Sequence, residues 1–279
     1  MVSTTAPPGY RNQDDEHWER PLAIREPHTL EEFSLNSKPI SAQDFDAERL
    51  TRKREAALGY RIMASWGWGA DGSGHITARD PEHTDCFWLL AYGIPFQQAT
   101  VENLVLVNEL GEVVQGHGDI NPAAFCIHAP IHANRPDVIG AIHAHTPYGT
   151  PFSALAEPLP MTSQEAAAFH HLQGVFHGEE VNVTDIATGQ QIAEALGTGR
   201  LVVLANHGLL TVGTSVASAV GFYLNAERAA EVCIKAPNGR QISDEAAAEA
   251  HKSVGHELNG WHVFQWLVRS RLNDPCAVG

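Results

Sequence analysis

The sequence predicts an α/β fold, because segments with helical and with strand periodicity alternate along most of its 279 residues. Hydrophobic residues make up 43% of the chain, an ordinary fraction for a globular domain. Several short runs rich in valine, leucine and isoleucine end in glycine, proline or polar turns, as buried strands do. The alternation by itself favours a parallel sheet with helices on both faces.

The first half of the chain opens with a polar, proline-bearing segment over 1–40 that has no clear period. We predict an extended N-terminal arm there, which could lie across a partner subunit. Ser41 resembles a helix N-cap, and an amphipathic helix is predicted over 46–60. Closely spaced glycines from Gly67 to Gly74 then break the helix. Strand-like runs follow at 75–79, 86–90 and 104–107, with a turn at 109–112 and extended structure at 113–114.

The second half continues the alternation and ends in helices. The predicted elements are a helix over 122–134, a buried strand over 138–145, a helix over 186–197, a buried strand over 201–205, and helices over 214–235 and 243–272. We predict a main domain over 41–240 and a helical extension over 241–279. The extension carries Trp261, Phe264 and Trp266, whose rings we expect at a subunit contact.

Charge and composition exclude several classes of partner. The formal net charge is −15, from 33 acidic and 18 basic residues, so the chain would repel nucleic acid phosphates and acidic membrane surfaces. No apolar run approaches the ~20 residues of a membrane span, and no secretory signal is recognisable, which predicts a cytoplasmic protein. Reduced structural thiols are predicted, because the four cysteines are far apart and form no CxxC: Cys86, Cys126, Cys233 and Cys276.

Histidine is unusually frequent, with 16 residues, and three of them suggest a metal site. His143 and His145 are two residues apart at the end of a predicted strand, so they face the same side and could chelate one ion. Such a pair can also be only a polar strand end. His207 strengthens the metal reading, because it follows a second buried strand directly before Gly208. Three imidazoles leave metal positions open for water, substrate or dioxygen, which suits iron(II) at least as well as zinc.

These histidines lie in segments that resemble the class II aldolase/adducin family. The matching segments read RPDV at 135–138, HAHTPY at 143–148 and NHGLL at 206–210, and further upstream GHITARD at 74–80 and NLVLV at 103–107. The resemblance runs from about residue 55 to about residue 235. It implies a three-layer α/β/α fold around a mostly antiparallel sheet, a metal bound by the three histidines, and a homotetramer with active sites between subunits.

The chain departs from the sugar-phosphate aldolases of that family at the positions that carry their chemistry. By register, Ala124 replaces the glutamate that moves the proton in those enzymes. His75, Tyr92 and the pair Pro122-Ala123 replace small hydroxyl and amide side chains of the phosphate site. Keeping the metal ligands while losing the base and the phosphate site predicts a different reaction at the same metal.

One branch of the family fits these departures. The segments GHITARDPEHTD at 74–85 and AAFCIH at 123–128 resemble the non-heme iron oxygenases of aminocoumarin antibiotic biosynthesis. This resemblance implies an Fe(II)-dependent oxygenase that uses dioxygen to decarboxylate an aryl 2-oxo or 2-hydroxy acid, of the 4-hydroxyphenylpyruvate or mandelate type. The alternatives are a zinc or manganese aldolase or decarboxylase acting on a non-phosphorylated substrate, and an adducin-like binding protein without catalysis.

The family register also suggests which side chains surround the metal. The expected catalytic residues are Tyr148 and Glu165, which could be a fourth ligand or a base, together with His170. His170 is included because it follows Glu165 in the same segment, and an exposed loop histidine is the alternative. The expected substrate-binding residues are His75, Tyr92, Phe125, Gln164 and Phe169. His128 and His132 are four apart on a predicted helix and could chelate, although a buried structural role for His128 is the favoured alternative.

Overall fold

The computed structural model describes residues 45–179 and 181–279. The predicted arm over 1–40 and the predicted cap at Ser41 lie outside the described residues. The first described element is α3 (Phe45–Ala64). It matches the helix predicted over 46–60 and ends four residues later.

An eight-stranded sheet forms the centre of the described structure, in the order β4-β3-β2-β1-β5-β8-β7-β6. The strands are β1 (His75–Arg79), β2 (Phe87–Leu90), β3 (Leu104–Val107), β4 (Val113–Gln115), β5 (Gly140–Ala144), β6 (Gln173–Phe176), β7 (Leu201–Leu204) and β8 (Gly208–Gly213). The sequence pattern does not predict β6, which is only half-buried, or β8, whose first residues belong to the NHGLL motif.

The sheet is mostly antiparallel. Among the described strands, β6 with β7 is the one parallel pair, and the other neighbours are all antiparallel. The direction inferred from alternation alone was therefore wrong, and the direction implied by the family resemblance is confirmed. Alternation does not determine direction, because connections as short as the three residues between β7 and β8 permit only antiparallel pairing.

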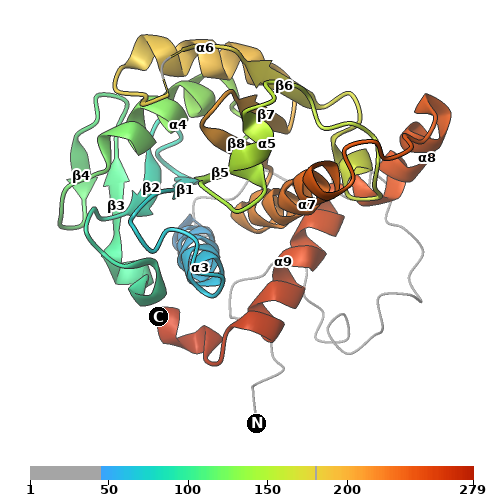
Figure 1. The fold of residues 1–279 in the computed structure, drawn as a ribbon. Helices are drawn as coiled ribbons and strands as arrows, with labels where there is room; N and C mark the ends of the chain where they lie inside the picture. Colours follow the sequence, from blue (N-terminus) through green and yellow to red (C-terminus); the bar gives the residue numbers. More distant parts are fainter. Residues whose placement is uncertain (1–44, 180) are drawn as a thin grey trace.

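Helices cover both faces of the sheet and complete a three-layer α/β/α architecture (Figure 1). One face packs against α4 (Pro122–Asn134) and α6 (Ile186–Leu196). The other face packs against α3, α7 (Val216–Lys235) and α9 (Glu257–Arg271). Short helices join these elements: η3 (Phe96–Gln98), η4 (Val101–Asn103), α5 (Gly149–Ser153), η5 (Ala166–Phe169) and η6 (Pro275–Val278).

Side chains on β1 and β5 alternate between the two faces of the sheet, and this alternation places polar side chains on the face that α4 covers. On β1, Ile76 belongs to the core cluster beneath α3 and α7, so its neighbours His75 and Thr77 point to α4. On β5, Ile142 lies in the same α3–α7 cluster, which turns His143 to the α4 face. Two buried strands thereby direct polar side chains into one layer of the protein.

The final predicted helix is two helices, α8 (Asp244–Val254) and α9, so the single helix expected over 243–272 was wrong. The break falls at Gly255 and His256. His256 is the N-cap of α9, and its side chain accepts a hydrogen bond from the Leu258 backbone N–H at 3.1 Å.

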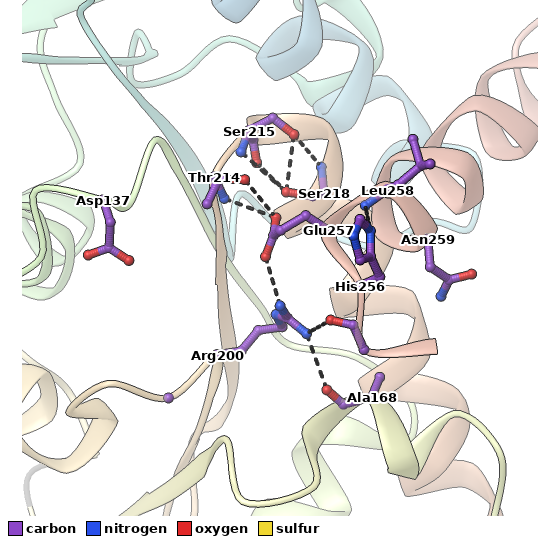
Figure 2. Close-up of polar contacts among 12 residues, drawn as sticks. Asp137, Ala168, Arg200, Thr214, Ser215, Ser218, His256, Glu257, Leu258 and Asn259 are labelled. Carbon is purple, nitrogen blue, oxygen red and sulfur yellow. Dashed lines mark hydrogen bonds and ion pairs between the residues drawn. The ribbon is translucent and has the colours of Figure 1, made fainter. Parts of the chain in front are cut away.

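The start of α9 is attached to the segments around β7 and β8 through a partly buried ion pair (Figure 2). Arg200 donates to Glu257 at 2.8 Å and to the backbone oxygen of Gly255 at 2.5 Å. The other carboxylate oxygen of Glu257 accepts from the backbone N–H and the hydroxyl of Thr214, both at 3.1 Å. The start of α9 is thereby tied to the strands β7 and β8.

The aromatic residues of α9 divide between core and surface. Phe264 is fully buried in the main core cluster, so its predicted place at a subunit contact was wrong. Trp261 is partly buried against the same cluster, whereas Trp266 is 57% exposed. Trp266, and in part Trp261, therefore remain available for the predicted contact.

We expect Glu257→Ala to lower the free energy of unfolding by about 2 kcal/mol, because it leaves the guanidinium of Arg200 without its carboxylate. Both side chains keep some exposure, 12% for Arg200 and 13% for Glu257, which holds the cost below that of a fully buried pair. Glu249→Ala is the matched control, because its ion pair with Lys252 is exposed and should contribute less than about 1 kcal/mol. Urea denaturation measures the free energy of unfolding of both variants. Equal losses would contradict a stabilising role for the Arg200–Glu257 ion pair.

No helix among residues 45–179 and 181–279 is long and apolar enough to cross a membrane. All four cysteines lie within these residues and are free thiols. Three of them are buried and Cys276 is exposed. The three buried cysteines thus contribute to packing, and no cysteine forms a disulfide within the described structure.

Candidate metal centre

His143, His145 and His207 converge at one edge of the α4 face. One nitrogen from each ring can be chosen so that all three lie within 4.8 Å of one another. The ring centroids are 4.6 Å apart for His143 and His207, 4.9 Å for His145 and His207, and 5.1 Å for His143 and His145. This confirms that the two predicted strand ends bring three imidazoles together, with one of them in the turn between β7 and β8.

Tight backbone turns hold this arrangement. Asn206 has a positive φ of 59°, in the left-handed region that asparagine tolerates better than most residues, and this bends the chain so that His207 turns back toward β5. At Gly208, an added Cβ would lie 3.1 Å from Cε1 of His143 and 3.0 Å from the backbone oxygen of Ala144. A glycine is therefore needed for β8 to approach the ring of His143 so closely.

His143 presents a free lone pair to the centre. Its Nδ1 lies 2.9 Å from the backbone oxygen of Leu209, which can only accept, so Nδ1 carries the proton. The Nε2 atom must then be an acceptor, and it is buried without a hydrogen-bond partner among the described residues. An unpaired buried acceptor is costly, and coordination of a divalent metal would satisfy it. The residues present therefore fit a metal held by these three histidines.

The protonation states also suit metal binding, because only neutral imidazole coordinates a metal. Burial, followed by the neighbouring His207 and His75, lowers the pKa of His143 well below its ordinary value. Burial and the nearby His145 lower the pKa of His207 to about 4. Burial lowers the pKa of His145, although the negative charge of Asp71 opposes the shift. All three rings are thus neutral near pH 7.

A buried chain of polar side chains leads away from the three histidines of the candidate centre. His75 pairs with His143 across β1 and β5, and their ring centroids are 5.0 Å apart. Nδ1 of His75 lies 2.8 Å from Nε2 of His128, and Nδ1 of His128 lies 2.7 Å from the hydroxyl of Thr77. That hydroxyl lies 2.8 Å from Nε2 of His132. We call His75, His128, Thr77 and His132 the histidine relay.

The relay can carry its protons in either of two consistent directions. In one of them, Nδ1 of His132 accepts from a guanidinium nitrogen of Arg79 that lies 3.3 Å away. Nε2 of His132 then donates to Thr77, Thr77 donates to His128, and His128 donates to Nδ1 of His75. The remaining proton of His75 sits on Nε2. Burial keeps the rings neutral, since it lowers the pKa of His132 to about 3 and those of His128 and His75 well below the ordinary value.

A cavity of about 470 Å³ begins at His75, a size typical of small-molecule sites. Its wall combines glycine-rich backbone before β1 with aromatic rings from the loop after β2. Residues of the wall include Tyr60, Asp71, Gly74, His75, Tyr92, Phe96 and Asn121. A second hollow of about 670 Å³ lies at the other end of the relay, where its wall includes His132 and Arg79. The relay therefore spans the layer between two cavities.

Two of the predicted substrate-binding residues, His75 and Tyr92, line the first cavity. The other three lie elsewhere. Phe125 is half-buried and stacks on Phe87 with a centroid distance of 6.3 Å. Phe169 is fully buried in the core against Phe222, and Gln164 is exposed.

The predicted catalytic residues have contacts of their own. Nε2 of His170 lies 2.8 Å from Asp244 of α8. The ring of Tyr148 lies 4.9 Å from the amine of Lys235. Glu165 is half-buried at the start of η5. Among the described residues, none of the three forms a hydrogen bond or ring contact with the metal-site histidines.

Comparison with known proteins places this site in a family. The family model described as the class II aldolase and adducin N-terminal domain matches residues 54–234. This chain belongs to the class II aldolase and adducin family. The family match covers the described sheet from before β1 to α7, including all three metal-site histidines.

Within the class II aldolase and adducin family, two relatives are each 36% identical to the chain. "Decarboxylase NovR" of Streptomyces niveus aligns over 85% of this chain and 90% of its own length. "4-hydroxy-3-prenylphenylpyruvate oxygenase/4-hydroxy-3-prenylbenzoate synthase" of Streptomyces roseochromogenus subsp. oscitans aligns over 77% and 80%. Among solved structures, an L-fuculose 1-phosphate aldolase from Glaciozyma antarctica has 34% identity and a TM-score of 0.75, covering 85% of this chain and 94% of its own.

The structure explains the altered positions of this class II aldolase family member. Ala124, at the glutamate position of the aldolases, is fully buried on α4 among apolar residues of β2 and β3. His128 lies one helical turn further along the same face of α4 and contacts His75. The proton-bearing side chains nearest the metal site on this face are thus histidines of the relay.

Sequence reasoning missed Thr77 and Arg79 as parts of the site. A signal was available, because His75, Thr77 and Arg79 alternate with apolar residues on a buried strand and so share one face. A polar stripe on a buried strand requires polar partners, and His128 and His132 on the predicted helix were the candidates. Only the packing of α4 on β1 shows that the two stripes meet.

The buried neutral histidines predict that the metal-free protein loses stability in acid. The unfolded chain binds a proton to each histidine below about pH 6.5, whereas the folded rings stay neutral down to about pH 4 for His207 and about pH 3 for His132. The folded state therefore binds fewer protons, and its stability should fall as the pH falls through this window. Each fully buried ring contributes about 1.4 kcal/mol per pH unit. A urea midpoint that is unchanged between about pH 7.5 and about pH 5 would contradict this prediction.

Proposed function

We propose that the protein is an Fe(II)-dependent oxygenase that oxidatively decarboxylates an aryl 2-oxo or 2-hydroxy acid, using His143, His145 and His207 as metal ligands. The observation that carries the proposal is the unpaired, buried Nε2 of His143 within a set of three neutral imidazoles. The names of the two relatives at 36% identity, a decarboxylase and a prenylphenylpyruvate oxygenase, support the reaction class.

The overall reaction balances without an external reductant. A 2-oxo acid and one dioxygen give one carbon dioxide and a 2-hydroxy acid that is one carbon shorter. A 2-hydroxy acid and one dioxygen give carbon dioxide, water and a carboxylic acid. A bound iron(II) would supply Lewis acidity toward the acid's oxygens and the redox chemistry of dioxygen.

The chain's own contribution is to hold the substrate and one proton. The aromatic side chains Tyr60, Tyr92 and Phe96 in the cavity wall suit an aryl ring better than a sugar phosphate. His75 borders both the cavity and His143, and its Nε2–H can donate a hydrogen bond to an oxygen of the acid. Because the relay orients this proton, His75 takes the place of the side chain that is lost at Ala124.

The test is dioxygen uptake by protein that has been loaded with iron(II) under anaerobic conditions. A panel of 4-hydroxyphenylpyruvate, phenylpyruvate and 4-hydroxymandelate should include one acid that consumes dioxygen and releases carbon dioxide in equal amounts. Zinc-loaded protein should not consume dioxygen. The absence of uptake with every acid, in protein shown to contain iron, would refute the proposal.

A metal-dependent aldolase acting on a non-phosphorylated substrate is the second candidate, favoured by the structural similarity to the fuculose 1-phosphate aldolase. Fully buried Ala124 speaks against it, since alanine cannot move the proton that aldol chemistry requires. Retro-aldol turnover by the zinc or manganese form without dioxygen would favour this candidate over the oxygenase.

We also propose a homotetramer with active sites between subunits, as the family resemblance implies. Two large apolar side chains support a surface that is covered by another subunit: Tyr92 at the cavity is 64% exposed and Trp266 on α9 is 57% exposed. Light scattering on the eluting protein should give four times the mass of the chain, and a monomer would refute this part of the proposal.

A further inference from the structure

A second cluster of metal-ligating side chains lies where η5 meets β6, against the first turn of α8. His170, His171 and Asp244 offer ligand atoms that all lie within 4.8 Å of one another. One oxygen of Asp244 lies 2.8 Å from Nε2 of His170 and 3.4 Å from Nε2 of His171. The cluster shares no residue with the three-histidine centre.

The backbone is bent to bring both imidazoles to one carboxylate. His171 has a φ of 55°, in the left-handed region that residues other than glycine rarely adopt. Consecutive side chains in extended backbone point to opposite sides, whereas the rings of His170 and His171 lie with centroids only 3.9 Å apart. Such strain costs about 1 kcal/mol or more, and strained residues concentrate at ligand-binding positions.

The chemistry of the three groups suits a divalent ion of the zinc class. His170 is buried and Asp244 is exposed, so the cluster opens to solvent on one side. The hydrogen bond from His170 lowers the pKa of Asp244, which leaves a carboxylate at neutral pH. Two imidazoles and one carboxylate are a common zinc ligand set, with the fourth position left for water or another side chain.

A third imidazole stands close by. The Nδ1 of His251 donates to the backbone oxygen of Ala167 at 2.8 Å, so the neutral ring presents its Nε2 as an acceptor. Its centroid is 6.3 Å from that of His170. The ordinary pairing of a histidine with an aspartate needs only one ring, so the two rings on one oxygen of Asp244 exceed what an ion pair requires.

We propose that His170, His171 and Asp244 form a second metal site, which binds a zinc-class divalent cation and fastens α8 to the body of the protein. Binding needs each imidazole to be neutral with its proton on Nδ1, so that the Nε2 lone pair is offered to the ion. The site joins the segment before β6 to the C-terminal extension, next to the attachment of α9 through Arg200 and Glu257. It acts on structure and takes no part in the proposed oxygenase reaction.

The test is a zinc titration by calorimetry in which the three-histidine centre has been removed. After treatment with a chelator, the His145→Ala/His207→Ala protein should bind one zinc per chain. Adding His171→Gly should weaken that binding at least tenfold. Glycine suits the left-handed backbone at this position, so the loss could not be attributed to unfolding.

Two controls make the result decisive. His177→Ala removes an exposed histidine six residues further along the chain and should leave zinc affinity unchanged. Hydrogen exchange in residues 244–254 should slow when zinc is added to the double variant, and should not slow in the same protein carrying Asp244→Asn. Absence of zinc binding by the double variant would overturn the proposal, and so would affinity that is unaffected by both His171→Gly and Asp244→Asn.

Discussion

Replacing His145 with alanine should abolish metal binding at the three-histidine centre while leaving the fold intact. His145 is the exposed member of the three ligands, so its removal leaves no cavity in the core. Loss of a group that only orients a ligand lowers metal affinity by about 10–100-fold. Loss of a ligand itself should lower it further. We therefore expect iron content and dioxygen uptake to fall by more than about 100-fold.

The measurement needs a background without the second proposed site. His171→Gly protein, with and without His145→Ala, would be loaded with iron(II) anaerobically and analysed for bound metal. His117→Ala is the matched control, because this histidine is also exposed and lies in a loop after β4. Retention of stoichiometric iron by the His145→Ala protein would exclude the three-histidine centre as the iron site, whatever the fate of activity.

Thr77→Val should separate the histidine relay from the metal. Valine has nearly the shape of threonine but no hydroxyl, so Nδ1 of His128 and Nε2 of His132 both lose their buried partner. Each unpaired buried group costs about 1–3 kcal/mol, and we expect a loss of roughly 3 kcal/mol in the free energy of unfolding. The orientation of the proton on His75 is lost as well, and turnover should fall by about 10–100-fold with the metal content unchanged.

The controls for this variant come from the same sheet. Thr77→Ser keeps the hydroxyl and should restore turnover. Thr211→Val removes an equally buried hydroxyl on β8, which donates to the backbone oxygen of Ala219 on the opposite face. It should destabilise the fold without slowing the reaction of folded protein. If Thr77→Val and Thr211→Val reduced turnover equally, the relay would have no role beyond packing.

Much of the candidate centre could be predicted from local patterns. The spacing of His143 and His145, the position of His207 after a buried run, and the helix over 122–134 are all properties of short segments. The structure contains that helix and brings the three histidines together. Strand periodicity identifies which side chains share a face, and a buried run identifies a strand. Both follow from backbone geometry that does not depend on the rest of the chain.

Sequence patterns could not provide the pairings between segments. The patterns of β1 and α4 do not predict that Thr77 lies between His128 and His132, because these contacts join positions more than fifty residues apart. The same holds for His170, whose nearest charged partner is Asp244, seventy-four residues away. Its position in the segment after Gln164 and Glu165 predicted a catalytic role for His170, but its contact with Asp244 depends on the packing of α8.

The sequence by itself determined the family of the chain and the three histidines of the candidate metal centre, since binary patterning and the spacing of imidazoles are properties of short segments. Strand direction, the path of the relay and the second histidine cluster depended on the tertiary structure. The physical reason is that burial makes each polar group find a partner, and which partner it finds is decided by long-range packing of helices on the sheet. At His143 the Nε2 atom is left without a partner among the described residues, and at His75 the requirement is met through three further side chains.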